Sequence, residues 1–217
     1  MKALLFYILF ISTLISSSNQ YNDALDEFID AEMYMLLNDF DLAEQSYKKA
    51  LESINYESPE TIYIELIKLY KYKGEYSNAL KYISASDDIE SLAIDLLHYE
   101  VLLKISDEMS STVLDGILSR PDVVNHINQL LEIQYSNHKW EHVIKVYSYM
   151  YEQSADIEYI DLIIELGTLT DGIVMALELS NSLVLNSQEV PIDQLYKISL
   201  LCIDNGLNET GLQNLDY

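Results

Sequence analysis

The residues that most suggest catalysis are two histidines and a glutamate within residues 138–142, whose sequence is HKWEH. This spacing fits the inverted zinc-protease signature H-x-x-E-H, in which two histidines bind zinc and the glutamate acts as general base. The chemistry requires both histidines on one face of a continuous helix. The repeat pattern described below instead places Asn137 and His138 in a turn between helices. We therefore expect no metal here, and a small zinc hydrolase using His138, Glu141 and His142 remains an alternative.

Other reactive side chains lack partners at the spacing that chemistry needs. His98 and His126 stand alone at helical positions, and Cys202, the single cysteine, lies in an apolar run. A lone cysteine in such a run predicts a buried, inert thiol. The carboxylates of residues 23–30 follow helical spacing and lack the order of a calcium loop. No glycine-rich phosphate loop, G-x-S-x-G elbow or C-x-x-C pair occurs, so the sequence predicts a non-enzymatic protein without a cofactor.

The charge of the chain limits its partners. The 217 residues include 36 acidic and 12 basic side chains, which gives a net charge of −24. Such a surface repels phosphate backbones and anionic lipid, so nucleic-acid binding is excluded as a function class. It attracts basic proteins, cationic peptides and divalent ions. We expect a protein or peptide partner, and a basic one fits the charge; the alternative that the acidity only keeps the protein soluble stays open.

The first 18 residues have the layout of a secretory signal peptide. Lys2 precedes an apolar run of about 13 residues, and the small residues at 16–18 follow it. The run is shorter than the roughly 20 residues of a membrane-spanning helix, and an uncleaved anchor is the alternative. No cysteine follows the run, and no later segment is apolar enough to span a membrane. These features predict an exported protein of the periplasm or cell envelope.

The elements that must position these side chains recur with a period of 36 residues. Small and aromatic residues at helical spacing make up the recurring set: Phe40, Ala43, Tyr47 and Ala50, then Tyr76, Ala79, Ile83 and Ser86, each preceded by a tyrosine at the same offset, Tyr34 and Tyr70. Spacing of three and four residues predicts helices. A fixed period of this length indicates a stacked array of helix pairs.

Prolines and aspartates predict the boundaries of the repeats. Pro59, Pro121 and Pro191 fit helix starts, and Asp87-Asp88 and Asp156 fit N-caps. Gly74 and Gly206 predict left-handed turns between the helices of a pair. A single domain over residues 19–217 is thereby divided into five helix pairs and a terminal remnant: 22–57, 58–86, 87–119, 120–155, 156–189 and 190–217.

These residues resemble the tetratricopeptide repeat (TPR), whose first helix carries large and aromatic residues and whose second helix alternates small and aromatic ones. The matches are Ala31, Tyr34, Phe40, Ala43, Tyr47 and Ala50 in one repeat, and Tyr63, Leu66, Tyr70, Gly74, Tyr76 and Ala79 in the next. The resemblance is specific over 24–86, moderate over 124–150 and inferential elsewhere, where a related α-solenoid stays open. It implies an all-α fold, a right-handed α-solenoid of stacked antiparallel helix pairs.

The resemblance also implies a concave groove lined by the first helix of each pair. The matching positions are Phe28, Glu32, Met35, Ile64, Lys68, Lys71, Tyr72, Asn128, Glu132 and Tyr135. Phe28 and Glu32 stand where one subfamily begins its clamp for a peptide carboxylate, so we do not expect that clamp. The implied function is an exported protein–protein interaction scaffold. A structural subunit of a larger envelope assembly, formed by self-association, is the alternative.

Overall fold

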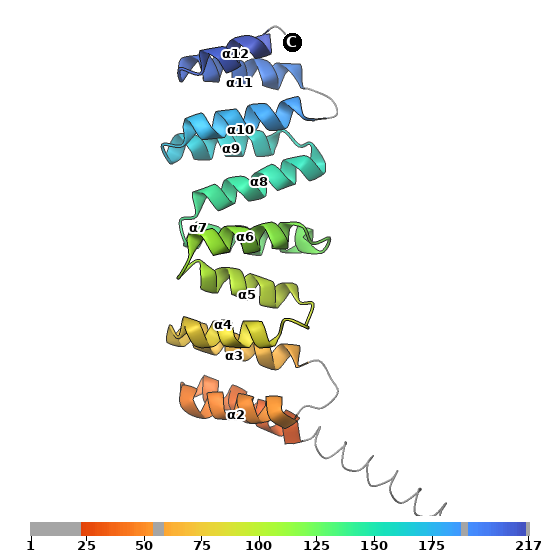
Figure 1. The fold of residues 1–217 in the computed structure, drawn as a ribbon, viewed down its shortest axis with the longest axis vertical. Helices are drawn as coiled ribbons and strands as arrows, with labels where there is room; N and C mark the ends of the chain where they lie inside the picture. The colour runs from red at the N-terminus through yellow and green to blue at the C-terminus, as the bar shows by residue number, and fades with distance from the viewer. Residues whose placement is uncertain (1–22, 54–58, 188–190, 216–217) are drawn as a thin grey trace, which may run out of the picture. The chain divides into compact units, whose positions relative to one another are not determined.

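The structure is a computed structural model that describes residues 23–53, 59–187 and 191–215. Throughout these ranges the chain forms helices and no strand (Figure 1), as the all-α prediction requires. The predicted signal peptide, residues 1–18, lies outside the described residues. Within them, no helix has both the length and the apolar character needed to cross a membrane.

The chain divides into two compact units, Met1–Val113 and Leu114–Tyr217. The division falls within α6 (Asp107–Leu118). The sequence predicted one array over residues 19–217, whereas contacts concentrate separately in these two parts. Each unit is described by itself.

Unit 1 consists of a helix over residues 23–36 followed by α2 (Phe40–Ser53), α3 (Glu60–Lys73), α4 (Tyr76–Ala85), α5 (Leu92–Leu102) and the first half of α6. Helix α3 packs against α2, α4 and α5. The core contains the recurring residues Ala43, Tyr47, Tyr70 and Ala79, all buried. The positions that define the repeat in the sequence are therefore the positions that hold the helices together.

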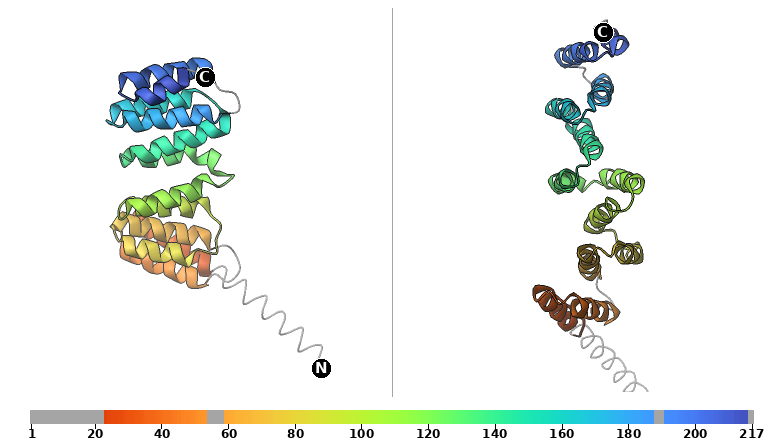
Figure 2. Two further views of the ribbon diagram at one scale, coloured as in Figure 1. Left: turned by 45° about the horizontal axis from the view of Figure 1, so that its top comes forward. Right: turned by 90° about the vertical axis from the view of Figure 1, so that its left-hand side faces the viewer.

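Unit 2 consists of the second half of α6, a 3-10 helix η1 (Val123–His126), α7 (Ile127–Ser136), α8 (Trp140–Ser154), α9 (Glu158–Leu169), α10 (Ile173–Leu185), α11 (Ile192–Asp204) and α12 (Asn208–Leu215). From α7 onward, consecutive helices pack on one another in chain order (Figure 2). Each segment predicted as a helix pair contains two consecutive helices. So does 190–217, which the sequence predicted as a remnant.

A common turn joins the two helices of most pairs. A residue with positive φ occurs in the turn at Asn38, Gly74, His138, Asp171 and Gly206. Five residues after each comes a buried residue, Ala43, Ala79, Val143, Ala176 and Gly211 respectively. One backbone hydrogen bond recurs in these turns: the Asp39 amide donates to the Tyr34 carbonyl and the Gly172 amide to the Gly167 carbonyl, each at 2.9 Å. The left-handed turns predicted at the two glycines are confirmed, and the same geometry continues where the sequence signature fades.

Two of the predicted helix starts are wrong. Ser91, rather than Asp87-Asp88, caps α5: its backbone is extended and its Oγ accepts a hydrogen bond from the Ile94 amide at 3.3 Å. The two aspartates lie in the turn after α4, ahead of Ser91. Pro121 lies in a turn that leads into η1, so α7 begins only at Ile127.

The other predicted starts are confirmed. Pro59 and Pro191 stand directly before α3 and α11. The N-cap position of α9 is Ile157 rather than Asp156, but Asp156, one residue earlier, accepts a hydrogen bond from the amide of Glu158, the first residue of the helix, at 3.0 Å. A carboxylate there satisfies an amide that has no partner within the helix.

Candidate functional site

The histidine motif does not form the geometry of a zinc protease. His138 lies in the turn before α8 with φ of 54°, and its ring lies against Trp140, with the ring centroids 5.5 Å apart. His142 is in the first turn of α8 and only 8% exposed. The predicted turn is confirmed, and the two histidines do not share a continuous helix. Across the ranges that the structure describes, no group of three His, Cys, Asp or Glu residues is placed to hold a metal ion.

The other isolated reactive side chains, Cys202 and His98, are buried and half-buried respectively. Cys202 is fully buried, as predicted, and burial together with the charge of Glu178 raises the pKa of its thiol, which disfavours the reactive thiolate. Burial also lowers the pKa of His98, which favours the neutral ring. Neither group points to catalysis.

In unit 1, the predicted groove residues of the first helix also hold that helix to α2. Tyr47, which is fully buried, donates its hydroxyl hydrogen to Glu32. The ring of Phe28 lies 5.8 Å from that of Tyr47, centroid to centroid, and Met35 packs against the same core. Phe28, Glu32 and Met35 are half-buried, so they contribute to the packing of the helix pair.

The predicted groove residues of α3 divide into paired lysines and an exposed aromatic. Lys68 forms an ion pair with Glu65 at 2.8 Å, and Lys71 forms one with Glu100. Ile64 is half-buried in the core, whereas Tyr72 is exposed. Because both lysines already have carboxylate partners, an acidic ligand is not favoured here.

In unit 2, Asn128 and Glu132 are exposed, and Tyr135 opens onto a hollow of about 410 Å3. We call it the aromatic hollow; α7, α8 and α9 line it through Tyr135, Trp140, Tyr147, Leu162, Glu165, Leu166, Leu169 and Thr170. Tyr135 alone among these was predicted from the sequence. The signal for one other was present, since Tyr147 follows the positive-φ residue His138 by nine positions, as Tyr47 follows Asn38.

Aromatic rings and one carboxylate give the aromatic hollow its chemistry. The hydroxyls of Tyr135 and Tyr147 are hydrogen-bonded at 2.8 Å, and the rings of Tyr135 and Trp140 meet edge to face at 5.6 Å and 68°. Burial, the Tyr135 hydroxyl and the charge of Glu165 all raise the pKa of Tyr147, so its hydroxyl stays protonated at neutral pH. The site offers ring faces and a negative charge, with no group activated for proton transfer or nucleophilic attack.

Large side chains are exposed near the end of the first helix at three of the five turns. The residue two positions before Asn38, Gly74 and Asp171 is Leu36, Tyr72 and Leu169 respectively, and these are 83%, 70% and 75% exposed. At the other two turns the same position is polar, Ser136 and Asp204. Of the three exposed side chains, Leu169 also lines the aromatic hollow.

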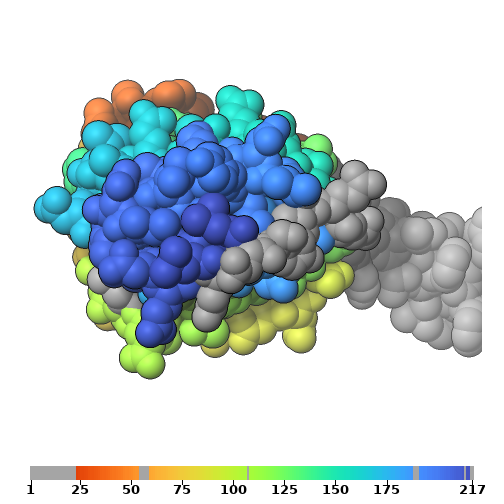
Figure 3. Space-filling model, turned by 90° about the horizontal axis from the view of Figure 1, so that it is seen from above, coloured from red at the N-terminus to blue at the C-terminus, as the bar shows by residue number. Residues whose placement is uncertain are grey.

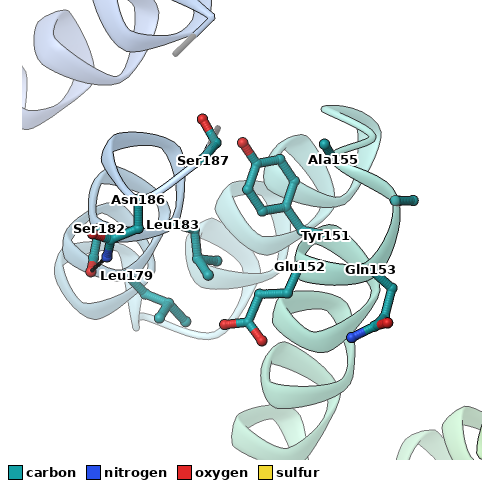
Figure 4. A pocket seen from close by; sticks show the side chains of 10 residues that line it. Tyr151, Glu152, Gln153, Ala155, Leu179, Ser182, Leu183, Asn186 and Ser187 are labelled. Carbon is teal, nitrogen blue, oxygen red and sulfur yellow. Dashed lines mark hydrogen bonds between the residues drawn. The ribbon is translucent and has the colours of Figure 1, made fainter. Parts of the chain in front are cut away.

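A larger hollow of about 840 Å3, the polar hollow, lies between the ends of α8 and α10 (Figure 4). Figure 4 shows Tyr151 and Glu152 of α8 on one side, with Ser182 of α10 and Asn186, which follows that helix, on the other. Two of its hydroxyls donate to backbone carbonyls: Ser187 Oγ to Val184 at 2.7 Å and Ser154 Oγ to Met150 at 2.8 Å. These two groups are engaged within their own helix ends, which reduces what the hollow offers to a ligand.

The acidic cluster predicted at the start of unit 1 is a solvated face. It surrounds a hollow of about 380 Å3, the acidic hollow, lined by Asp23, Asp26, Glu27, Asp30, Lys49, Glu52 and Ser53. Lys49 pairs with Glu27 at 3.3 Å. The remaining carboxylates give this surface a strongly negative potential.

One buried group in unit 2 leads to a stability prediction. Gln134 of α7 is fully buried, and neither its amide nitrogen nor its amide oxygen has a hydrogen-bond partner among the described residues. Burying polar atoms without hydrogen-bond partners costs free energy. Gln134→Leu keeps a similar volume and removes those polar atoms, so we expect it to stabilise unit 2 by about 1–3 kcal/mol. Urea denaturation measures this, with the exposed Gln153→Leu as control. A decrease in the stability of Gln134→Leu would contradict the placement of this side chain.

No protein-family model matches the sequence, and no curated protein matches it either. The likeness to tetratricopeptide repeats is therefore carried by the residues of this chain alone.

Proposed function

We propose that this chain is an exported, TPR-like scaffold of the cell envelope that binds a basic segment of a protein partner on the first-helix face of its repeats. The observation that carries the proposal is the aromatic hollow, which the first helices α7 and α9 line through Tyr135 and Glu165, together with Trp140 and Tyr147 of the second helix α8. Across the described ranges, helix pairs without strands that share one turn geometry, with a buried residue five positions later, support a right-handed solenoid. A preformed surface lowers the ordering cost of binding on the receptor side.

The groups at this surface suit binding rather than catalysis. Interface centres are enriched in tyrosine and tryptophan, which provide a large rigid contact area at small entropic cost. The aromatic hollow holds three such rings beside the exposed Leu169. The net charge of −24 favours a basic partner and speeds its encounter with the scaffold.

The alternative function, a self-associating structural subunit, has one observation in its favour. Apolar side chains are exposed on the last helix pair, which faces the viewer in Figure 3; they are Ile192, Tyr196, Leu200, Leu212 and Leu215. Two copies of a chain with net charge −24 repel each other, so self-association is the weaker proposal. Concentration-dependent sedimentation at physiological salt distinguishes the two, because a scaffold for a different protein stays monomeric.

Affinity capture with a matched pair of variants tests the scaffold. Leu169→Lys places a positive charge and a polar group at the mouth of the aromatic hollow. Met175→Lys makes the same charge change on α10, where Met175 is 44% exposed. From cells that produce the tagged protein, we expect Leu169→Lys to recover at least about tenfold less of a dominant basic protein, the effect of losing one central interface contact.

The control variant should recover the same protein in wild-type amount. Equal recovery by Leu169→Lys and wild type would contradict the placement of the binding face. Circular dichroism of both variants confirms that each one is folded.

A further inference from the structure

We propose that the aromatic hollow receives a lysine or arginine side chain of the partner segment. This inference rests on the proposed function and names the chemistry that the site recognises. Its occupant is a cationic side chain of a protein, and a neutral aliphatic side chain is the competing outcome of the test.

The rings around the hollow can hold a cation. Tyr135, Trp140 and Tyr147 all line it, and the near-perpendicular arrangement of Tyr135 and Trp140 turns their rings in different directions around the space. The face of an aromatic ring attracts a cation through its quadrupole, and tryptophan and tyrosine do so strongly. Several rings around one space make this attraction less dependent on the exact position of the cation.

The charges around the hollow have one sign. Glu165 lies in its wall, and no lysine or arginine is among the lining residues. Glu165 is close enough to Tyr147 for its charge to disfavour the tyrosinate form. A positive charge placed beside the rings would therefore meet a carboxylate at short range, whereas an acidic side chain would be repelled.

The remaining wall fits the stem of a basic side chain. Leu162, Leu166 and Leu169 provide an apolar surface on α9. Lysine and arginine pack their methylene groups on such surfaces while the charged end reaches polar groups. A volume of about 410 Å3 accommodates either side chain.

The single tryptophan of the chain makes the test direct. Trp140 lines the aromatic hollow, so the tryptophan fluorescence of the full chain reports on this site alone. The probe is the pentapeptide acetyl-Ala-Ala-Arg-Ala-Ala-amide, compared with peptides that carry citrulline or leucine in place of arginine. Citrulline keeps the shape of arginine without its charge. We expect a saturable change in emission with the arginine peptide, and affinities at least about tenfold weaker for the two neutral peptides.

Two variants of equal net charge separate site binding from general attraction. Glu165→Gln removes the carboxylate of the hollow, and Glu152→Gln removes an exposed carboxylate of the polar hollow. We expect Glu165→Gln to reduce the affinity for the arginine peptide about tenfold, and Glu152→Gln to keep it within about twofold of the wild-type value. Equal weakening by the two variants, equal binding of the citrulline peptide, or no response of Trp140 to the arginine peptide would each overturn the assignment.

The failure of this inference can be told apart from failure of the scaffold. If the arginine peptide does not bind while Leu169→Lys still fails to capture the basic protein, the assignment of a cationic side chain to the hollow is wrong and the scaffold proposal is retained. If Leu169→Lys captures as much as wild type, the scaffold itself is wrong.

Discussion

Gly167→Val is expected to destabilise unit 2 by about 1–3 kcal/mol, because the added side chain would overpack the contact between α9 and α10. A Cβ atom on Gly167 would lie 2.4 Å from the Cβ of Ala176 and 3.3 Å from the Gly172 carbonyl oxygen. Neither neighbour can move alone, since Ala176 is fully buried and Gly172 belongs to the turn between the two helices. The two backbones would have to separate.

Gly116→Ala provides the control for this prediction. A Cβ on Gly116 of α6 would meet nothing within 4 Å. Alanine restricts the unfolded chain and favours helix, so we expect this variant to be more stable by about 0.5–1 kcal/mol. Thermal and urea denaturation measure both changes. Wild-type stability in Gly167→Val would show that α9 and α10 do not approach as closely as the structure places them.

Glu44→Gln is expected to destabilise unit 1 by about 1–3 kcal/mol at pH 7, because it removes the carboxylate that holds three donors together. Glu44 accepts hydrogen bonds from Lys48 at 2.6 Å, from the Tyr70 hydroxyl at 2.8 Å and from Lys73 at 3.0 Å. These contacts link α2 to the end of α3. Lys73 keeps Asp41 and Glu75 as further partners, which limits the loss.

The same cluster predicts how stability depends on pH. Burial raises the pKa of Glu44, but the hydrogen bonds from Lys48, Tyr70 and Lys73 outweigh it and lower the value from 4.5 to about 2. The folded value is below the unfolded one, so this stabilisation is complete above about pH 4.5 and is lost as the pH falls through about 2. Urea denaturation at pH 7 and pH 2 should show a gap between wild type and Glu44→Gln that shrinks on acidification.

An exposed carboxylate on the same helix serves as control for the pH experiment. Glu52→Gln, also on α2, should behave as wild type at both pH values to within about 0.5 kcal/mol. A gap between wild type and Glu44→Gln that is independent of pH would contradict the ionic cluster.

The helices could be predicted because their determinants are local. Small and aromatic residues at helical spacing predicted the pairing of the first helices, and Gly74 and Gly206 predicted two of the left-handed turns. The turn at His138 was predicted from the repeat register, whereas the positive φ at Asn38 and Asp171 was not, because these residue types adopt positive φ less often than glycine does. The cap of α5 was misplaced because two aspartates are as good a sequence signal as Ser91, and only the backbone shows which one reaches the amide.

The candidate site was harder to predict because it depends on how three helices pack. Tyr135 was expected in a groove from the repeat register, but its partners Trp140, Tyr147 and Glu165 belong to two other helices. Trp140 and Tyr147 both pack against the core and form part of the hollow wall, a double role that the repeat register does not show. The partners of the lysines were equally inaccessible to the sequence, which does not show that Glu100 lies beside Lys71.

Site-specific photocrosslinking from residue 135 tests the central claim, binding of a basic protein on the first-helix face, most directly. A photoreactive phenylalanine analogue replaces Tyr135, which is 41% exposed, or in the control Met175, which is 44% exposed on the second helix of its pair. Cells that produce each photoreactive variant are irradiated, and mass spectrometry then identifies the protein crosslinked to it. We predict one dominant basic protein attached from residue 135 and absent from residue 175. The same attachment from both positions, or attachment only of a second copy of this chain, would contradict the account.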